Sequence, residues 1–105
     1  MNTDTTIELV REWGRQKGII GPNASGTQRG QLFKLMEEVG ELKHAIQTDD
    51  RDEKIDAIGD CTVVLILLAE MIEVPLEYCL DAAYQVISQR TGRMVDGQFV
   101  KDTNE

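Results

Sequence analysis

The spacing of apolar residues along the chain predicts four helices. Apolar side chains recur every three or four positions, the period of an amphipathic helix, in four stretches separated by glycine-, proline- or charge-rich turns. These stretches run over about residues 4–17, 27–47, 49–73 and 75–92. The pattern therefore predicts an all-α fold.

Residues at the ends of these stretches support the boundaries. The first predicted helix opens on the capping box Thr5-x-x-Glu8, and the third opens on the acidic stretch 49–53, where negative charge suits the helix dipole. Pro75 fits the first turn of the fourth helix, which is expected to end near Thr91-Gly92. Beyond it, Asp96-Gly97 lies between short apolar stretches and predicts a hairpin, although a tail docked on the helices would look similar.

The size of the chain limits it to one domain, spanning residues 1–105. With 105 residues, 41% of them apolar, it has room for a single modest core. Because a four-helix domain this small often completes its core with a second copy, we expect a homodimer or homotetramer.

The net charge narrows the possible partners. At −8, the chain does not resemble a nucleic-acid-binding protein, which needs clustered Lys and Arg. An acidic site would also repel an anionic substrate, unless a divalent cation were bound there.

Three features indicate a cytoplasmic location. Cys61 and Cys79 lie 18 positions apart in apolar surroundings and suit reduced thiols rather than a disulfide framework. The polar N-terminus has no apolar signal core, and the longest apolar run, residues 63–69, is too short to cross a membrane.

The second predicted helix carries a polar row beside its apolar row. At about 100° per residue, the apolar row is followed by a neighbouring row of Gln31, Lys34, Glu38 and Glu41, while Glu37 points further outward. Two carboxylates thus lie one turn apart at the edge of the core. Alone, the row is also consistent with a solvated flank held by pairs such as Lys34–Glu38.

The third predicted helix adds two more carboxylates. Asp56 and Asp60 share one face, and the helix from Cys61 to Ala69 is apolar on every side apart from Thr62, which predicts burial all round. A carboxylate at the mouth of a core needs a cation, hydrogen bonds or protonation. Asp60 could cap a neighbouring helix or pair with Lys34, but one lysine cannot pair with four or five converging carboxylates. Oxygen ligands without His or Cys suit Mg²⁺ or Mn²⁺.

The two acidic segments together resemble those of the MazG-like nucleotide pyrophosphohydrolases. Glu37-Glu38-x-x-Glu41 matches their EExxE pattern, and Asp60, which precedes the buried run, matches the aspartate of their ExxD pattern. Ala57 stands where the pattern has glutamate, and Asp56, on the face of Asp60, is the nearest acid. The lead-in Gln31-x-x-Lys34 and the segment 90–101 resemble compact members found in bacteriophages.

The resemblance implies an all-α fold, Mg²⁺ as cofactor, and cleavage of a nucleoside triphosphate to a monophosphate and pyrophosphate. Carried over by position, Glu38, Glu41 and Asp60 would be metal ligands, with Asp56 as a substitute ligand. Glu37 or Glu38 would orient the attacking water, and Glu37 is favoured because it is the least committed to the metal face. On the fourth helix only Arg90 matches the family, since Gln85 and Ser88 replace its Asn and Lys.

Further residues complete the expected site. Gln31, Lys34 and Arg90 are candidates for substrate contacts, and Trp13 could stack on the base or pack in the core or a dimer contact. Two other functions remain open on this evidence: an inactive module that has kept the fold, or a related pyrophosphatase acting on dUTP or phosphoribosyl-ATP.

Overall fold

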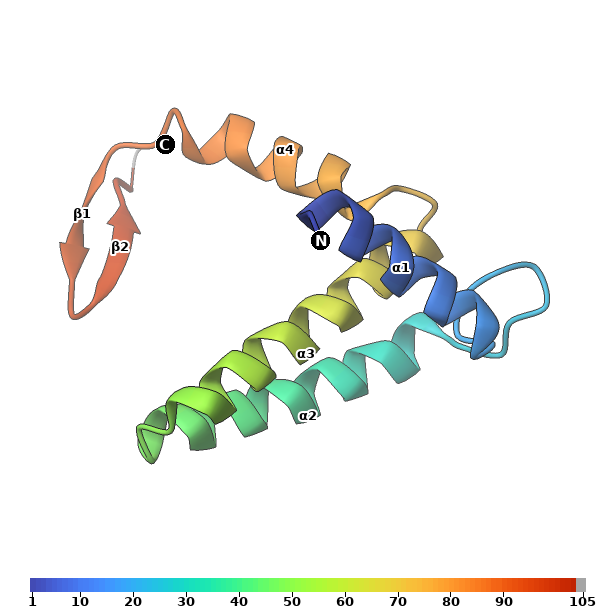
Figure 1. Ribbon diagram of the computed structural model, residues 1–105. Coiled ribbons are helices and arrows are strands. Elements are labelled where there is room, and N and C mark those ends of the chain that lie inside the picture. Colours follow the sequence, from blue (N-terminus) through green and yellow to red (C-terminus); the bar gives the residue numbers. More distant parts are fainter. Residues whose placement is uncertain (104–105) are drawn as a thin grey trace.

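The computed structural model describes residues 1–103 and confirms the all-α fold with a C-terminal hairpin (Figure 1). Its elements, in chain order, are α1 (Thr3–Gln16), α2 (Gln28–Gln47), α3 (Arg51–Met71), α4 (Leu76–Ile87), β1 (Gly92–Val95) and β2 (Gln98–Lys101). Within residues 1–103, no helix is both long enough and apolar enough to cross a bilayer.

Short polar side chains begin three of the helices. Thr27 and Asp50 cap α2 and α3 by accepting hydrogen bonds from the backbone N–H of Gly30 and Glu53. The capping box expected at Thr5 is wrong, because Asn2 caps α1 and its side chain accepts from the N–H of Thr5. Thr5 itself therefore lies inside the helix.

The predicted end of the fourth helix is also wrong, since α4 stops at Ile87. The chain continues through turns closed by hydrogen bonds between residues three positions apart. In these turns the backbone N–H of Gln89 donates to the carbonyl of Val86, and the backbone N–H of Arg90 donates to the carbonyl of Ile87. Gly92 belongs to the hairpin rather than to a helix stop. A Cβ on Gly92 would lie 2.3 Å from the carbonyl oxygen of Val100, so glycine permits the close approach of β1 to β2.

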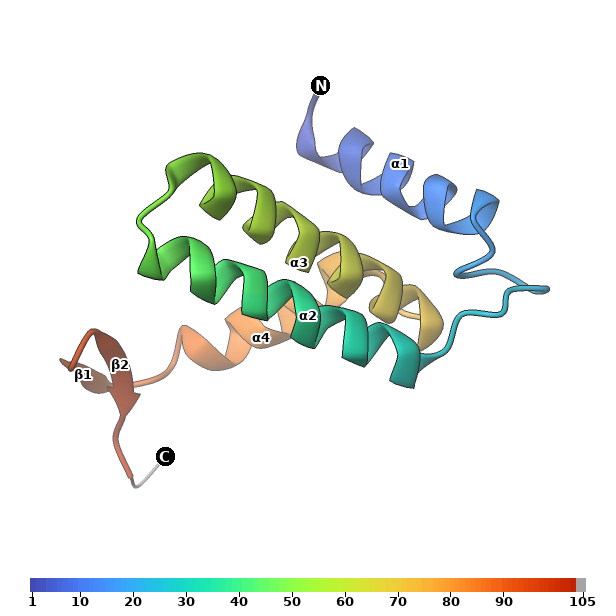
Figure 2. The ribbon, with the colours of Figure 1, turned by 90° about the horizontal axis from the view of Figure 1, so that it is seen from below.

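The core lies along α3. Helices α2 and α3 run antiparallel side by side, and α1 packs on α3 rather than on α2 (Figures 1 and 2). The buried apolar side chains are mainly those of α3, among them Val64, Ile66 and Leu67. Helix α3 is not buried all round as predicted, because Leu65 is 42% exposed.

The last part of the chain extends away from this core. Helix α4 packs on α3 and is joined to α1 by the ion pair between Glu77 and Arg11, and the hairpin of β1 and β2 contacts no helix among the described elements. Figure 1 shows both elements projecting from the α1–α3 body; we call them the C-terminal arm, residues 76–101. The Asp96-Gly97 turn joins the two strands, with φ of 49° and 81°, as a two-residue hairpin loop requires.

Candidate functional site

Three carboxylates from α2 and α3 converge on one point. One oxygen each of Glu38, Glu41 and Asp60 lies within 4.8 Å of the others. Glu38 and Glu41 are one helical turn apart, and the antiparallel packing of α2 on α3 brings Asp60 against them. Residues distant in the sequence thus form one acidic cluster, as the sequence predicted for these three.

Glu38 is the buried member of the cluster. It is 5% exposed, and its Oε1 lies 3.2 Å from Nζ of Lys34. Its other oxygen, Oε2, is buried and has no hydrogen-bond partner among the described residues. Because an unpaired buried carboxylate oxygen is costly, this arrangement fits a cation bound between the carboxylates.

Mutual repulsion and burial raise the pKa values of two carboxylates in the cluster. The neighbouring Glu38 raises the pKa of Glu41 above its usual value. Burial, followed by the charges of Asp56 and Glu38, raises the pKa of Asp60. Glu38 also raises the pKa of Lys34. The carboxylates are therefore short of positive charge, the condition under which a proton or a divalent cation binds.

The other predicted acidic residues lie at the edge of the cluster. Glu37 is exposed, with Oε1 3.6 Å from Nζ of Lys34. Asp56 is exposed and outside the group of three, although its charge is felt by Asp60. Ala57 is 3% exposed, so the position of the family's glutamate is buried.

A pocket of about 600 Å³ opens over the cluster between α1, α2 and α3. Five predicted residues line it: Trp13, Gln31, Lys34, Glu38 and Asp60. The rest of the lining is an apolar wall of Ile19, Val63, Val64 and Leu67, the loop residues Ser25, Gly26 and Thr27, and Gly30 at the start of α2. The pocket therefore places an aromatic ring, a lysine and the carboxylates around one space.

Sequence reasoning missed the loop that borders this pocket. Gly26 packs so closely on the loop that a Cβ there would lie 2.1 Å from the carbonyl oxygen of Ile19. Ser25 donates its backbone N–H to the carbonyl of Gly18 at 3.0 Å. The glycine-rich composition of residues 18–30 indicated a loop, but not that the loop folds back beside α2.

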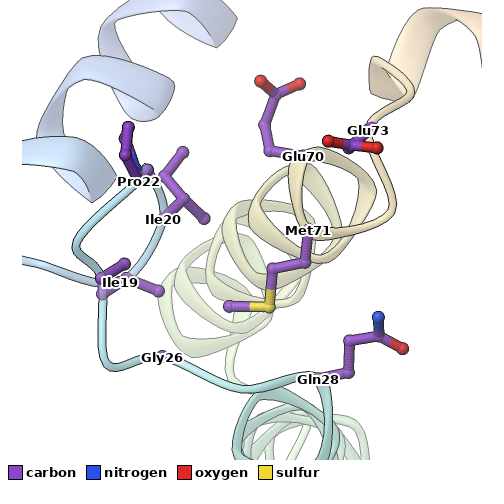
Figure 3. Close-up of a pocket in the computed structure, with 10 residues that line it drawn as sticks. Ile19, Ile20, Pro22, Gly26, Gln28, Glu70, Met71 and Glu73 are labelled. Carbon is purple, nitrogen blue, oxygen red and sulfur yellow. The ribbon is translucent and has the colours of Figure 1, made fainter.

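A second pocket of about 540 Å³ lies where the same loop meets the end of α3. Figure 3 shows Ile19, Ile20 and Pro22 from the loop, with Met71, Glu70 and Glu73 from the α3 end. Among residues 1–103, its lining holds two carboxylates and no cationic side chain. It does not contain the acidic cluster, and an anionic substrate would be repelled from it.

Arg90 is not brought to the cluster. It lies on the C-terminal arm, where it lines a separate pocket with Val86, Gln89 and Lys101. The reason is that α4 leaves the body beside α3 and does not pack on α2. Within one chain, Lys34 is the cation that lines the pocket over the cluster, among the described residues.

Comparison with known proteins agrees with this geometry. A family model described as the MazG nucleotide pyrophosphohydrolase domain matches residues 27–93, which include the whole acidic cluster. The chain belongs to the MazG nucleotide pyrophosphohydrolase family. The family resemblance and the all-α fold predicted from the sequence are thereby confirmed.

One similar protein is a phage protein of undetermined role. The MazG chain is 34% identical over 64 residues to an uncharacterised 18.2 kDa protein in the rep-hol intergenic region of Haemophilus phage HP1 (strain HP1c1). The alignment covers 61% of this chain and 37% of the phage protein, so the chain matches little more than a third of that relative. No solved structure matches the chain.

Proposed function

We propose that this MazG protein hydrolyses a nucleoside or deoxynucleoside triphosphate to the monophosphate and pyrophosphate, with Mg²⁺ as cofactor. The observation that carries the proposal is the buried Glu38, whose unpartnered Oε2 lies in the cluster with Glu41 and Asp60. A pocket that holds Trp13 and Lys34 opens over the same cluster. Metal and nucleotide would thus bind side by side.

The carboxylates suit a hard divalent cation. Glu38, Glu41 and Asp60 would hold Mg²⁺, and the exposed Asp56 would reach it through a water; Mn²⁺ would be accepted in its place. When bound, the metal ion would offset the charge of the triphosphate and of the transition state.

The remaining residues would bind and orient the reactants. Trp13 would stack on the base, while Lys34 and Gln31 would contact phosphate oxygens. Glu37, exposed beside Lys34, would accept a proton from the water that attacks the α-phosphorus. The bond from that phosphorus to the bridging oxygen then breaks, and pyrophosphate leaves.

For assembly and location, the proposal keeps what the sequence predicts. Large apolar side chains on α2 and α3 stay half-exposed in one chain, which favours a homodimer or homotetramer. Cys61 and Cys79 are free thiols, which suits the cytoplasm of a bacterium or an infected host cell.

The decisive experiment measures pyrophosphate release from a panel of ribo- and deoxynucleoside triphosphates, with and without Mg²⁺. Wild-type protein should release pyrophosphate only with metal, and Glu38→Gln should reduce the rate by about 100-fold or more. Asp52→Asn, an exposed carboxylate in the first turn of α3, is the matched control and should retain activity.

An absence of release from every substrate with Mg²⁺ or Mn²⁺ would overturn the proposal. Ala57, buried where the family pattern has glutamate, would then indicate an inactive member that has kept the fold. Release from dUTP or phosphoribosyl-ATP alone would assign one of the related activities.

A further inference from the structure

Helix α1 brings Trp13 to the pocket over the cluster, but few of its residues hold it on the body. It packs on α3 and not on α2, so the pocket lies between α1 and the α2–α3 pair. Its buried residues are Arg11 and Gly14, which are three positions apart and therefore share one face of the helix. Arg11 pairs with Glu70 near the end of α3, and Gly14 has no side chain. The contact of α1 with α3 therefore depends on these two residues.

Gly14 allows α1 to lie directly against a core side chain of α3. A Cβ on Gly14 would lie 2.5 Å from Cδ2 of Leu67 and 3.3 Å from Cγ1 of Ile20. Leu67 is 2% exposed, so the packed core around it leaves no space into which its side chain could turn. A larger residue at position 14 would therefore push α1 away from α3, and Trp13 would move with it.

The backbone of Gly14 also holds the loop that borders the pocket. Its carbonyl accepts a hydrogen bond from the N–H of Ile19 at 2.9 Å, and the N–H of Gly18 donates to the carbonyl of Arg15 at 3.2 Å. With a φ of 74° at Gly18, these two bonds end α1 in a Schellman motif. Ile19 lines the pocket, so its position is tied to that of Gly14.

Three parts of the pocket lining thus meet at one glycine. Trp13 precedes Gly14 on α1, Ile19 is bonded to it from the loop, and Leu67 lies against it from α3. We propose that Gly14 is a positioning residue that sets the width of this pocket. Because it has no side chain, Trp13 and Ile19 close on the wall of α3 around the nucleotide base. This inference rests on the proposed function for the identity of the ligand.

The expected effect of a larger residue is on substrate binding and not on the chemical step. Glu38, Glu41 and Asp60 belong to α2 and α3, and Leu67 lies about two helical turns beyond Asp60. Gly14→Ala should therefore raise KM about ten-fold, through weaker stacking of the base, and leave kcat within about two-fold. A merely structural role would have the opposite signature, because a smaller folded fraction lowers the apparent kcat and leaves KM unchanged.

Binding and the position of Trp13 are measured without turnover. Calorimetric titration uses Mg²⁺ and a panel of α,β-methylene nucleoside triphosphates, in which a carbon replaces the oxygen of the bond to be cleaved. The Kd of the best ligand should rise about ten-fold in Gly14→Ala. Trp13 is the one tryptophan of the chain, so acrylamide quenching of its fluorescence in the nucleotide-free protein should increase as α1 moves outward. Gly59→Ala, where nothing lies within 4 Å of the new methyl group, is the matched control and should change neither value.

A complementary substitution tests the contact itself. Leu67→Val removes the Cδ2 atom that a methyl group on residue 14 would meet. Alone, Leu67→Val should loosen the contact and raise Kd, but combined with Gly14→Ala it should return Kd to within about three-fold of the wild type. Because Leu67→Val disturbs the same contact from the other helix, it tests the proposal even if Gly14→Ala does not fold.

The outcomes separate this inference from the proposed function. An unchanged KM and Kd in Gly14→Ala, or effects that simply add in the double variant, would overturn the positioning role. A wild-type protein that binds a methylene triphosphate but releases no pyrophosphate from any substrate would overturn the proposed function, and the calorimetric comparison would then decide the role of Gly14 alone. A wild-type protein that binds none of the panel would overturn both.

Discussion

Glu38 shows how one side chain can be unfavourable for the fold and useful for the site. Lys34 pairs with Oε1 at 3.2 Å, whereas Oε2 is buried without a hydrogen bond among the described residues. Glu41 and Asp60 place further negative charge beside it. The metal-free protein therefore contains a repulsion that a divalent cation would relieve.

This gives a prediction for stability at the residue scale. Glu38→Gln should melt at a temperature equal to or above that of the wild type without metal, because the repulsion with Glu41 and Asp60 is removed. It should lose the rise in melting temperature that Mg²⁺ causes in the wild type. Circular-dichroism melting with and without Mg²⁺ measures both effects. An undiminished Mg²⁺-dependent rise in the variant would contradict the ligand role of Glu38.

Between elements, Arg11 joins three helices. Its side chain is 9% exposed, with Nη1 3.1 Å from Glu8 on α1, Nε 3.2 Å from Glu70 on α3, and Nη2 bonded to Glu77 on α4. The Arg11 hydrogen bond, followed by the backbone N–H of Glu77, holds the pKa of Glu77 below its usual value. This ion-pair cluster fixes the start of the arm against α1 and α3.

The lowered pKa predicts the direction of a pH effect. A carboxylate with a depressed pKa in the folded state stabilises the fold above its unfolded pKa and loses that contribution as pH falls through the folded value. Wild-type stability should therefore fall from about pH 5 downward, and more steeply than that of Glu77→Gln. Urea titrations from pH 7 to about pH 3 measure the difference. Asp81 is an exposed carboxylate on α4, so Asp81→Asn should lose stability with falling pH as steeply as the wild type.

The α1–α2 loop depends on Gly26. A Cβ at this position would collide with backbone atoms of Ile19, which cannot move aside as a side chain would. Gly26→Ala should lower the free energy of unfolding by about 1–3 kcal/mol. Gly59→Ala, where nothing lies within 4 Å of the new methyl group, should raise it by about 0.5–1 kcal/mol. Chemical denaturation measures both changes. If the two substitutions changed the free energy of unfolding equally, the loop would not hold this conformation.

At the scale of the whole molecule, too little apolar surface is buried within one chain. The core residues come mainly from α3, while large side chains on α2, α4 and the hairpin remain half-exposed. For a chain of 105 residues, such a core is small, and association with further copies would add to it.

Association makes stability depend on concentration. The melting temperature of the wild type should rise as its concentration is increased, because dilution favours dissociated chains. Calorimetry over a hundred-fold concentration range measures the shift. A melting temperature that stays constant over this range would contradict assembly.

The amino-acid sequence by itself determined the features that depend on near neighbours. Apolar periodicity predicted four helices, and Asp96-Gly97 predicted the hairpin turn that the structure contains. One-turn spacing placed Glu38 and Glu41 on one side of a helix, and the apolar run after Asp60 placed that residue at the edge of the core. Helical period and turn preference are local properties, so these predictions did not need the packing of the chain.

Only the tertiary structure decided which of these residues meet. Burial of Glu38, the wall of Val63 and Leu67 beside Trp13, and the placement of Asp56 outside the cluster depend on how α1 and α2 pack on α3. Arg90 lies away from the cluster because α4 diverges from α2. Angles between helices and the path of a loop arise from contacts between residues far apart in the sequence, and helical periodicity contains no information about them.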